Sequence, residues 1–468
     1  MNWNYNQVTD MVIESNSGSL LTMGLFGLEK ESQRITSGGE LALTPHPAAF
    51  GDKTQNPRIT TDFSESQIEM ITPPLPSIEE TYKALKQINT EVKEGIGSEM
   101  LWPLSMPPKL PGDDLIPIAR FNETEEGRKK EEYRENLAKR YGRKMQMISG
   151  IHYNFSFDNS LLNLLYDNFG NGMDRQEFVN EAYVSAARNF LRYRWLLIYL
   201  FGASPVCDST YNPVIKKELA VIQKCCPDCC DIVKDFSKYI TSLRVSRFGY
   251  SDTNDGKNNV LFSSLSEYTE KIEKMLAEGS IQRESEFYSP IRPKQVVSTS
   301  ETQLEALRKN GIKYMEVRII DLNPFEELGI SIDQLRFLQI FMLFCLLNES
   351  PEITETELEE INFNHHLVSL YGRRKDLPLY RYSNNYKVLR DFGGEIFKKL
   401  SDIAVIIEDS TGDKNYITSV GKEYQKLIDP ELLPSQRIVS EMSKSKESFL
   451  QFGVRYAKKY SHVLAGRT

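Results

Sequence analysis

Hydrophobic and polar residues alternate along several short segments of the chain, and this two-residue period predicts β-strands. In the segment GLEKE, the period places Glu29 and Glu31 on the same face of a strand. In the segment 151–157, His152 and Asn154 share a polar face, and aromatic residues occupy the opposite face. The polar faces of both strands are therefore predicted to line a space that holds water or metal.

A third segment, 314–319, alternates in the same way. Glu316 and Arg318 lie on one face of the predicted strand, and apolar side chains lie on the other. This strand therefore offers charge on one side only.

The segment 59–69 adds three more carboxylates, those of Asp62, Glu65 and Glu69, shortly before a proline stop signal. If its second half is extended, Glu65 and Glu69 share a strand face. If it is helical, the i, i+4 spacing also places them on one side. Both readings predict a cluster of carboxylates.

Longer segments have apolar residues at helical spacing. The sequence SIEE at 77–80 is a capping-box signal, and the apolar residues after it predict a helix over 78–95. Further helices are predicted near 125–140, 175–201, 263–277, 332–348, 354–371, 392–408 and 435–460.

The polar strand faces have two interpretations. On an open antiparallel sheet, such a face is simply the charged outer surface, where Lys and Glu usually intermingle. Here the faces carry Glu, Asp, His, Asn and Arg, which are ligands for hard divalent cations together with an anion-binding guanidinium. A metal and phosphate site is the second interpretation.

Composition narrows the class of protein. The chain has 468 residues, of which 40% are hydrophobic and 26% charged, and no repeat or linker divides it, which favours a single domain over 1–468. Lys and Arg number 57 against 65 Asp and Glu, a net charge of −8, so binding to nucleic acid or to an anionic membrane by bulk electrostatics is not expected. Without a signal peptide or an apolar run long enough to cross a bilayer, a cytoplasmic protein is expected.

Several familiar motifs are missing from the sequence. It has no P-loop and no Rossmann glycine pattern, so any nucleotide phosphates would be held through metals on carboxylates. The cysteine cluster at 225–230 lacks the second ligand pair of a structural zinc site, which favours a surface turn, with a metal or redox role as the alternative. Cys345, in an apolar helical segment, is predicted to lie in the core.

A set of motifs resembles one family. Spread over about 20–350 in a constant order, these segments together closely resemble bacterial glutamate–cysteine ligase: GLEKE at 27–31, TPHP at 44–47, ITTDFSE at 59–65, LWPLSMP at 101–107, SGIHYNF at 149–155, YLFGASP at 199–205 and PIRPK at 290–294. The part from about 351 to 468 resembles the family only in its helical character.

The resemblance implies an α+β fold similar to glutamine synthetase, in which a curved, mostly antiparallel sheet forms a funnel-shaped active site and helices pack outside. It implies the first step of glutathione synthesis, in which ATP, glutamate and cysteine give γ-glutamylcysteine, ADP and phosphate through γ-glutamyl phosphate. ATP would be a co-substrate and Mg²⁺ the metal, with Mn²⁺ as an alternative. No protein partner is implied, and the chain length favours the enzyme of the single step over a bifunctional relative with an ATP-grasp module.

The resemblance also assigns residues. The implied magnesium ligands are Glu29, Glu31, Asp62, Glu69, His152 and Glu316. Arg318 is implied to stabilise charge on the transferring phosphoryl group, together with Glu316, and a structural ion pair with Glu316 is its alternative role. The residues implied to shape the amino-acid pockets are Tyr133, Arg134, Gln146, Asn154, Arg244, Tyr250 and Tyr288.

Two points stay open at the level of sequence. A few side chains could redirect the same fold to an acceptor amine other than cysteine, and a non-catalytic relative could bind metal or amino acid as a sensor. His365 and His366 follow the matched motifs and receive no role.

Overall fold

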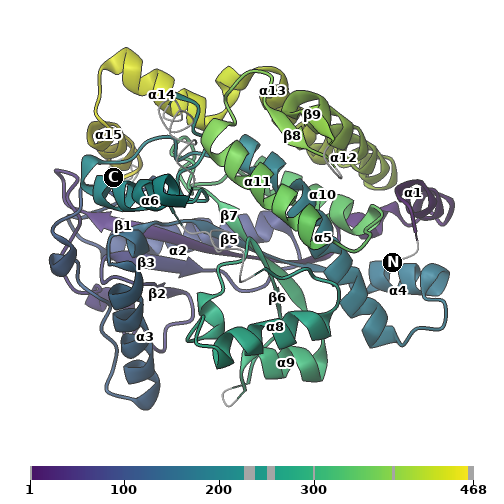
Figure 1. The fold of residues 1–468 in the computed structure, drawn as a ribbon, viewed down its shortest axis with the longest axis horizontal. Helices are drawn as coiled ribbons and strands as arrows, with labels where there is room; N and C mark the ends of the chain where they lie inside the picture. The colour runs from purple at the N-terminus through teal and green to yellow at the C-terminus, as the bar shows by residue number, and fades with distance from the viewer. Residues whose placement is uncertain (1–2, 226–237, 250–258, 299–300, 382–384, 462–468) are drawn as a thin grey trace, which may run out of the picture.

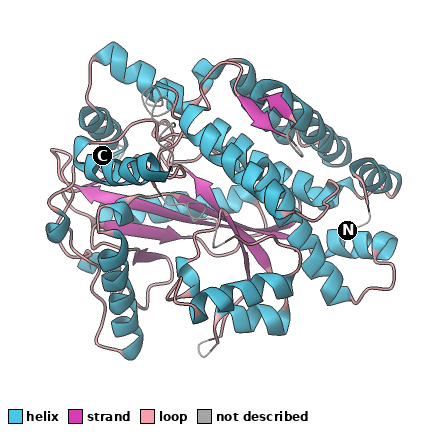
Figure 2. Cartoon of the chain, in the orientation of Figure 1, coloured by secondary structure: helices cyan, strands magenta, loops and turns pink. Residues whose placement is uncertain are grey.

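The central element of the computed structural model is a sheet whose strands come from widely separated parts of the chain (Figures 1 and 2). The structure describes residues 3–225, 238–249, 259–298, 301–381 and 385–461. The strands are β1 (Gly24–Ile35), β2 (Ile59–Thr61), β3 (Gln67–Ile71), β4 (Met100–Leu101), β5 (Ile151–Phe157), β6 (Ile291–Lys294) and β7 (Tyr314–Ile320). They are ordered β2-β3-β1-β5-β7-β6, with β4 paired to β1, and β8 (Pro378–Tyr380) and β9 (Tyr386–Val388) form a separate pair.

All the strand pairs of this sheet are antiparallel, and their register brings the predicted polar residues together. Glu29 of β1 lies opposite His152 of β5, and Glu31 lies opposite Glu69 of β3. Side chains at facing positions point to the same side of a sheet, so strands β1, β3 and β5 contribute to one polar face. The strands predicted from alternation at 27–31, 151–157 and 314–319 are confirmed as parts of β1, β5 and β7.

The opposite face of the sheet belongs to the core. Leu28, Tyr153 and Val317 are fully or almost fully buried there, and helices α2 and α5 contact the strands. Lys30 also points to this side, where its Nζ donates a hydrogen bond to Asn89 of α2 at 3.0 Å. Burial, together with the nearby positive charge of Lys93, lowers the pKa of Lys30 to about 7.

Helices make up most of the remaining described chain. They are α1 (Tyr5–Glu14), α2 (Ile78–Gly95), α3 (Glu125–Tyr141), α4 (Asn159–Phe169), α5 (Arg175–Phe201), α6 (Asn212–Cys225), α8 (Leu265–Ala277), α9 (Gln303–Asn310), α10 (Ile332–Leu347), α11 (Glu355–Tyr371), α12 (Leu389–Thr411), α13 (Asn415–Ile428), α14 (Pro434–Ser445) and α15 (Phe449–Ser461). Ser77 caps α2 by accepting a hydrogen bond from the backbone of Glu80, which is one of the two bonds of the predicted capping box. The long helices α5, α10, α11, α12 and α13 form a layer along one side of the sheet (Figure 1). The predicted α+β class is confirmed.

The prediction of one helix over 435–460 is wrong. The chain forms α14 and α15 there, because Lys446 adopts a left-handed conformation with φ of 54° and ends the first helix. Ser448 then starts the second helix: its hydroxyl accepts from the backbone of Gln451, whose side chain accepts from the backbone of Ser448. Helices α1, α4, α6, α9 and α13 are not among the predicted ones.

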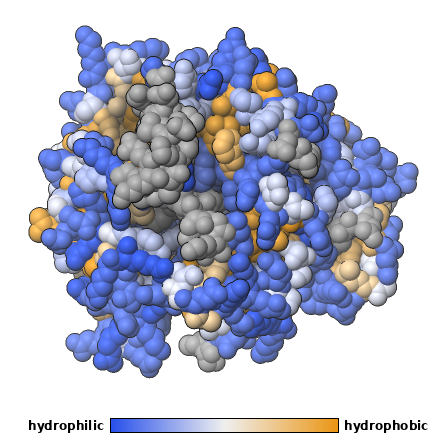
Figure 3. Space-filling model, viewed as in Figure 1, coloured by the Kyte–Doolittle hydropathy of each residue, from blue (hydrophilic) through white to orange (hydrophobic). Residues whose placement is uncertain are grey.

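Polar side chains cover most of the surface seen in Figure 3, and hydrophobic ones gather there only in small groups. Cys345 is fully buried, as predicted. Most of the cysteine cluster at 225–230 lies outside the described residues. Within the described chain, every helix is too short or too polar to span a lipid bilayer.

Candidate active site

A cavity of about 270 Å³ lies over the polar face of the sheet. It is lined by the predicted site residues Glu29, Glu31, Asp62, Glu69, Tyr133, Arg134, Gln146, His152, Arg244, Tyr288, Glu316 and Arg318. The strands supply Glu29, Glu31, Glu69, His152, Glu316 and Arg318, and Asp62 directly follows β2. The other residues of this set come from helices and loops outside the sheet. Residues that are distant in sequence therefore meet because of the antiparallel register.

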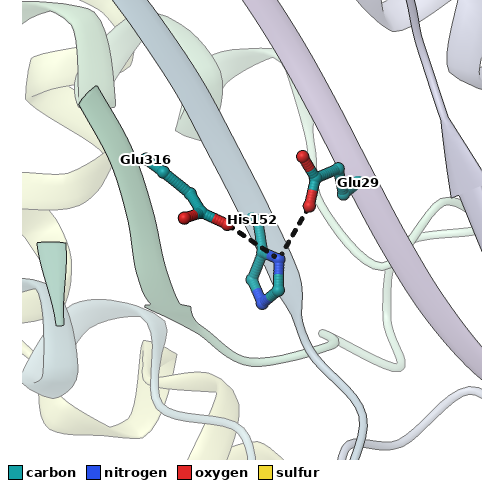
Figure 4. A group of neighbouring side chains, drawn as sticks. All are labelled: Glu29, His152 and Glu316. Atoms are coloured by element: carbon teal, nitrogen blue, oxygen red, sulfur yellow. Dashed lines mark hydrogen bonds and ion pairs between the residues drawn. The ribbon is translucent and has the colours of Figure 1, made fainter. Parts of the chain in front are cut away.

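His152 lies at the centre of the carboxylates. Glu29 and Glu316 approach it from the strands on either side (Figure 4), with Glu29 Oε2 at 3.0 Å and Glu316 Oε1 at 3.6 Å from His152 Nδ1. One ligand atom from each of these three residues lies within 4.8 Å of the others, a spacing that one cation could bridge. Burial raises the pKa of Glu29, but the hydrogen bonds from His152 and Asn154 bring it below its ordinary value.

Glu31 and Glu69 extend the negative charge along the sheet. Glu31 accepts a hydrogen bond from the backbone N–H of Gly150 at 2.8 Å and lies 3.8 Å from His152 Nε2. Burial, followed by the repulsion of Glu29, Asp62 and Glu31, raises the pKa of Glu69 well above its usual range. Burial and Asp62 also raise the pKa of Glu31. The carboxylates in this part of the cavity are therefore buried and repel one another.

Positive charge gathers on the other side of Glu316. Arg318 Nη1 lies 2.6 Å from Glu316 Oε1, and Lys294 Nζ lies 3.8 Å from Glu316 Oε2. Although burial opposes ionisation, Arg318 and Lys294 hold the pKa of Glu316 well below its usual range. Glu316 is therefore a carboxylate at the boundary between the acidic and the basic halves of the cavity, and the ion pair with Arg318 that was considered at the sequence level is present.

The two other arginines predicted in the site are anchored on the backbone. Arg134 of α3 donates to the carbonyl oxygens of Thr61 and Asp62. Arg244 Nη2 donates to the carbonyl oxygen of Arg318 at 2.8 Å. Both guanidinium groups line the cavity, and Arg244 Nη1 also lies 3.8 Å from Asp321 Oδ1, a buried carboxylate.

Some predicted residues lie elsewhere. Asn154 does not line the cavity; its amide donates to Glu29 Oε1 at 2.9 Å. Tyr250 lies outside the described residues. Glu65, from the predicted carboxylate cluster, faces away from the cavity and pairs with Lys53 at 2.6 Å. The second half of the segment 59–69 is extended, which confirms the strand and not the helix of the two predicted alternatives.

The cavity is also lined by polar residues that are not among the predicted site residues. These are Ser285, Ser289, Arg292, Lys294 and His365. Arg292 and Lys294 alternate with Ile291 and Pro293 along β6, so the signal that found the other strands was present in this segment. No comparable signal marks His365, which sits in the middle of a helix.

Such a cavity suits an enzyme that binds a divalent cation next to an anionic substrate. The family model for glutamate–cysteine ligase matches residues 10–368. The chain is 52% identical to a glutamate–cysteine ligase of Clostridium acetobutylicum over 480 residues, which cover 98% of this chain and 100% of that protein. The chain therefore belongs to the glutamate–cysteine ligase family.

Other relatives agree with this assignment. The bifunctional glutathione biosynthesis protein GshAB of Clostridium perfringens is 41% identical over 438 residues, which cover 93% of this chain and 54% of that protein. A solved structure of glutamate–cysteine ligase from Francisella tularensis in complex with AMP matches with a TM-score of 0.83 and 28% identity, covering 95% of this chain and 90% of that one.

Proposed function

We propose that this chain is an ATP-dependent glutamate–cysteine ligase, which joins the side-chain carboxylate of glutamate to the amino group of cysteine. Family membership over nearly the full length supports the reaction, and the AMP-bound relative supports the nucleotide. The observation in the structure that carries the proposal is the junction at Glu316, where a row of carboxylates on three strands meets Arg318 and Lys294.

The carboxylate face fits a divalent cation. Glu316 Oε2 is buried and has no hydrogen-bond partner among the described residues. Glu69 and Glu31 have raised pKa values because carboxylates crowd around them, and added positive charge would relieve that repulsion. Hard oxygen donors of this kind suit Mg²⁺. The proposed ligands are Glu29, Glu31, Asp62, Glu69, His152 and Glu316.

The reaction joins two anions in its first half. The glutamate side-chain carboxylate attacks the γ-phosphorus of ATP, the bond to the β,γ-bridging oxygen breaks, and γ-glutamyl phosphate and ADP form. In the second half, the cysteine amine attacks the acyl carbon, loses a proton and displaces phosphate, which leaves with one former carboxylate oxygen. Bound Mg²⁺ would offset the repulsion between the two reacting anions.

The chain's own side chains would orient these groups. Arg318 is oriented by its ion pair with Glu316, and its planar guanidinium suits the oxygens of a phosphoryl group. Arg244 and Arg134, which line the cavity and are held by backbone carbonyls, would contact amino-acid carboxylates or phosphates. Tyr133, Gln146 and Tyr288 would shape the walls of the amino-acid pockets.

The proposal is tested by ADP release from the purified protein with Mg-ATP and glutamate. Cysteine is present, absent or replaced by alanine or 2-aminobutyrate, and the peptide product is identified by mass spectrometry. Cysteine-dependent turnover that yields γ-glutamylcysteine is the expected result. Turnover with another amine but poor use of cysteine would assign a different acceptor, and no turnover with any amine would favour a non-catalytic relative.

A further inference from the structure

His365 lies in the middle of α11, and its ring touches the wall of the cavity. Its side chain is buried, with only 2% of the residue exposed. Neither the motifs in the sequence nor the reaction proposed above uses it. Its two ring nitrogens nevertheless have well-defined partners, and these partners fix what the residue can do.

The tautomer of His365 follows from its neighbours. Arg194 Nε lies 2.8 Å from His365 Nδ1, and an arginine can only donate, so Nδ1 must be the unprotonated acceptor. The proton of the neutral ring is therefore on Nε2, which donates to the carbonyl oxygen of Val245 at 2.6 Å. Arg194 is itself held by Asn362 at 2.7 Å and is 1% exposed. Burial, then the positive charge of Arg194, lowers the pKa of His365 well below its usual range, so the ring stays neutral.

A histidine with both nitrogens engaged is not free to bind a metal or to transfer a proton. Val245, however, directly follows Arg244, whose guanidinium lines the cavity and donates to the backbone of Arg318 at 2.8 Å. The hydrogen bond from His365 thus holds the carbonyl of the residue that directly follows this arginine. Helix α11 also holds the chain a few residues before Arg244, because the backbone N–H groups of Thr241 and Ser242 donate to the carbonyl of Ser369 at 2.9 and 3.1 Å.

We infer that His365 is a positioning residue, which holds the Val245 carbonyl so that Arg244 reaches an amino-acid substrate in the cavity. This inference rests on the proposed function in one respect only, the role of Arg244 toward a substrate. That His365 holds the segment is a separate statement, and it can be tested without activity.

The test compares two substitutions at His365 with a control on the same helix. In His365→Gln, the amide nitrogen reaches about as far as Nε2 and can still donate to Val245. In His365→Asn, the shorter amide reaches only the position of Nδ1. Asn364→Ala is the control, because Asn364 is similarly buried, at 4%, but exchanges hydrogen bonds at 2.8 Å with the backbone of Tyr380, away from the cavity.

The first measurement is hydrogen exchange of the peptide that spans 238–249, followed by mass spectrometry. His365→Asn should speed exchange in this peptide, and His365→Gln and Asn364→Ala should leave it close to that of the unchanged protein. Equal exchange in all variants, or equal acceleration by Asn364→Ala, would overturn the inference.

The second measurement separates KM from kcat in the ligase assay. His365→Asn should raise the KM of glutamate or of cysteine about tenfold, the effect of one lost hydrogen bond, and leave the KM of ATP unchanged. In His365→Gln, the KM of glutamate and the KM of cysteine should stay close to those of the unchanged protein. If the unchanged protein shows no turnover, the proposed function fails, and the exchange data alone decide whether His365 holds the segment. If turnover is normal but the Asn and Gln variants have the same KM values, the role in positioning Arg244 is wrong.

Discussion

Gly150 provides a way to displace Arg244 without touching it. Gly150 precedes β5, and its backbone pairs with Glu31: its N–H donates to the carboxylate at 2.8 Å and its carbonyl accepts from the Glu31 N–H at 3.0 Å. A Cβ added here would lie 2.0 Å from Arg244 Nη2 and 2.3 Å from Arg244 Cζ. The absence of a side chain at this position makes room for the guanidinium.

The size of the effect follows from this overlap. An ordinary contact needs about 3.4 Å, so in Gly150→Ala the guanidinium must move by about 1.4 Å. Such a movement breaks the hydrogen bond from Arg244 to the Arg318 carbonyl and takes the charge away from its position in the cavity. A hydrogen bond that involves a charged group contributes about 1.5–3 kcal/mol, so the KM of the amino acid bound by Arg244 should rise by about 10- to 150-fold.

The fold should survive this substitution. Gly150 has no positive φ, so alanine does not strain the backbone, and the atoms in the way are at the end of a flexible side chain. The loss in free energy of unfolding should be about 1–2 kcal/mol. Gly421→Ala, where an added Cβ has nothing within 4 Å, is the control and should leave KM unchanged; because Gly421 lies inside α13, it should raise the free energy of unfolding by about 0.5–1 kcal/mol.

The assay is steady-state ADP release with glutamate, cysteine and ATP varied in turn, with urea unfolding of each variant alongside. Gly150→Ala is also placed in an Arg244→Ala background. If the alanine acts only by displacing Arg244, it should have almost no further effect there. Normal KM values in Gly150→Ala, or the same loss with and without Arg244, would refute the reasoning.

Three further predictions concern the carboxylates and their partner arginine. Glu316→Gln keeps the shape but removes the charge that pairs with Arg318, so ADP release should fall at least about 100-fold while the circular dichroism spectrum is unchanged; near-normal turnover would remove Glu316 from the site. Arg318→Lys should lower kcat more than it raises the KM of ATP, because lysine lacks the planar fork, and a change in KM alone would point to simple binding. Because the pKa of Glu69 is raised in the folded state by burial and by Glu29, its ionisation destabilises the metal-free protein as pH rises above about 4.5. Glu69→Gln should therefore raise the melting temperature of metal-free protein at pH 8 but not at pH 4.5, and should reduce the stabilisation by added Mg²⁺; equal effects at both pH values would contradict this.

The polar face could be predicted from sequence because its signal is local. Each of β1, β5 and β7 has its own two-residue alternation, so the orientation of Glu29, His152 and Glu316 did not depend on the rest of the chain. The register between the strands could not be predicted in this way. Pairings between separate segments decide that Glu31 lies opposite Glu69. They also decide that Glu65 points away from the cavity and pairs with Lys53.

The helical parts show the same limit. The break between α14 and α15 depends on a left-handed Lys446, a residue type that gives no warning of such a conformation. His365 could not be recognised because its partners, Arg194 and Val245, come from other segments. Residues whose function depends on a contact at long sequence separation carry little local signal.

The central claim is that glutamate is activated as an acyl phosphate in this cavity before cysteine attacks. The most direct measurement uses glutamate labelled with ¹⁸O in its side-chain carboxylate, together with Mg-ATP and cysteine, and weighs the peptide and the released phosphate. The account predicts γ-glutamylcysteine and one ¹⁸O atom in each phosphate released. Phosphate without label alongside normal peptide formation would contradict it.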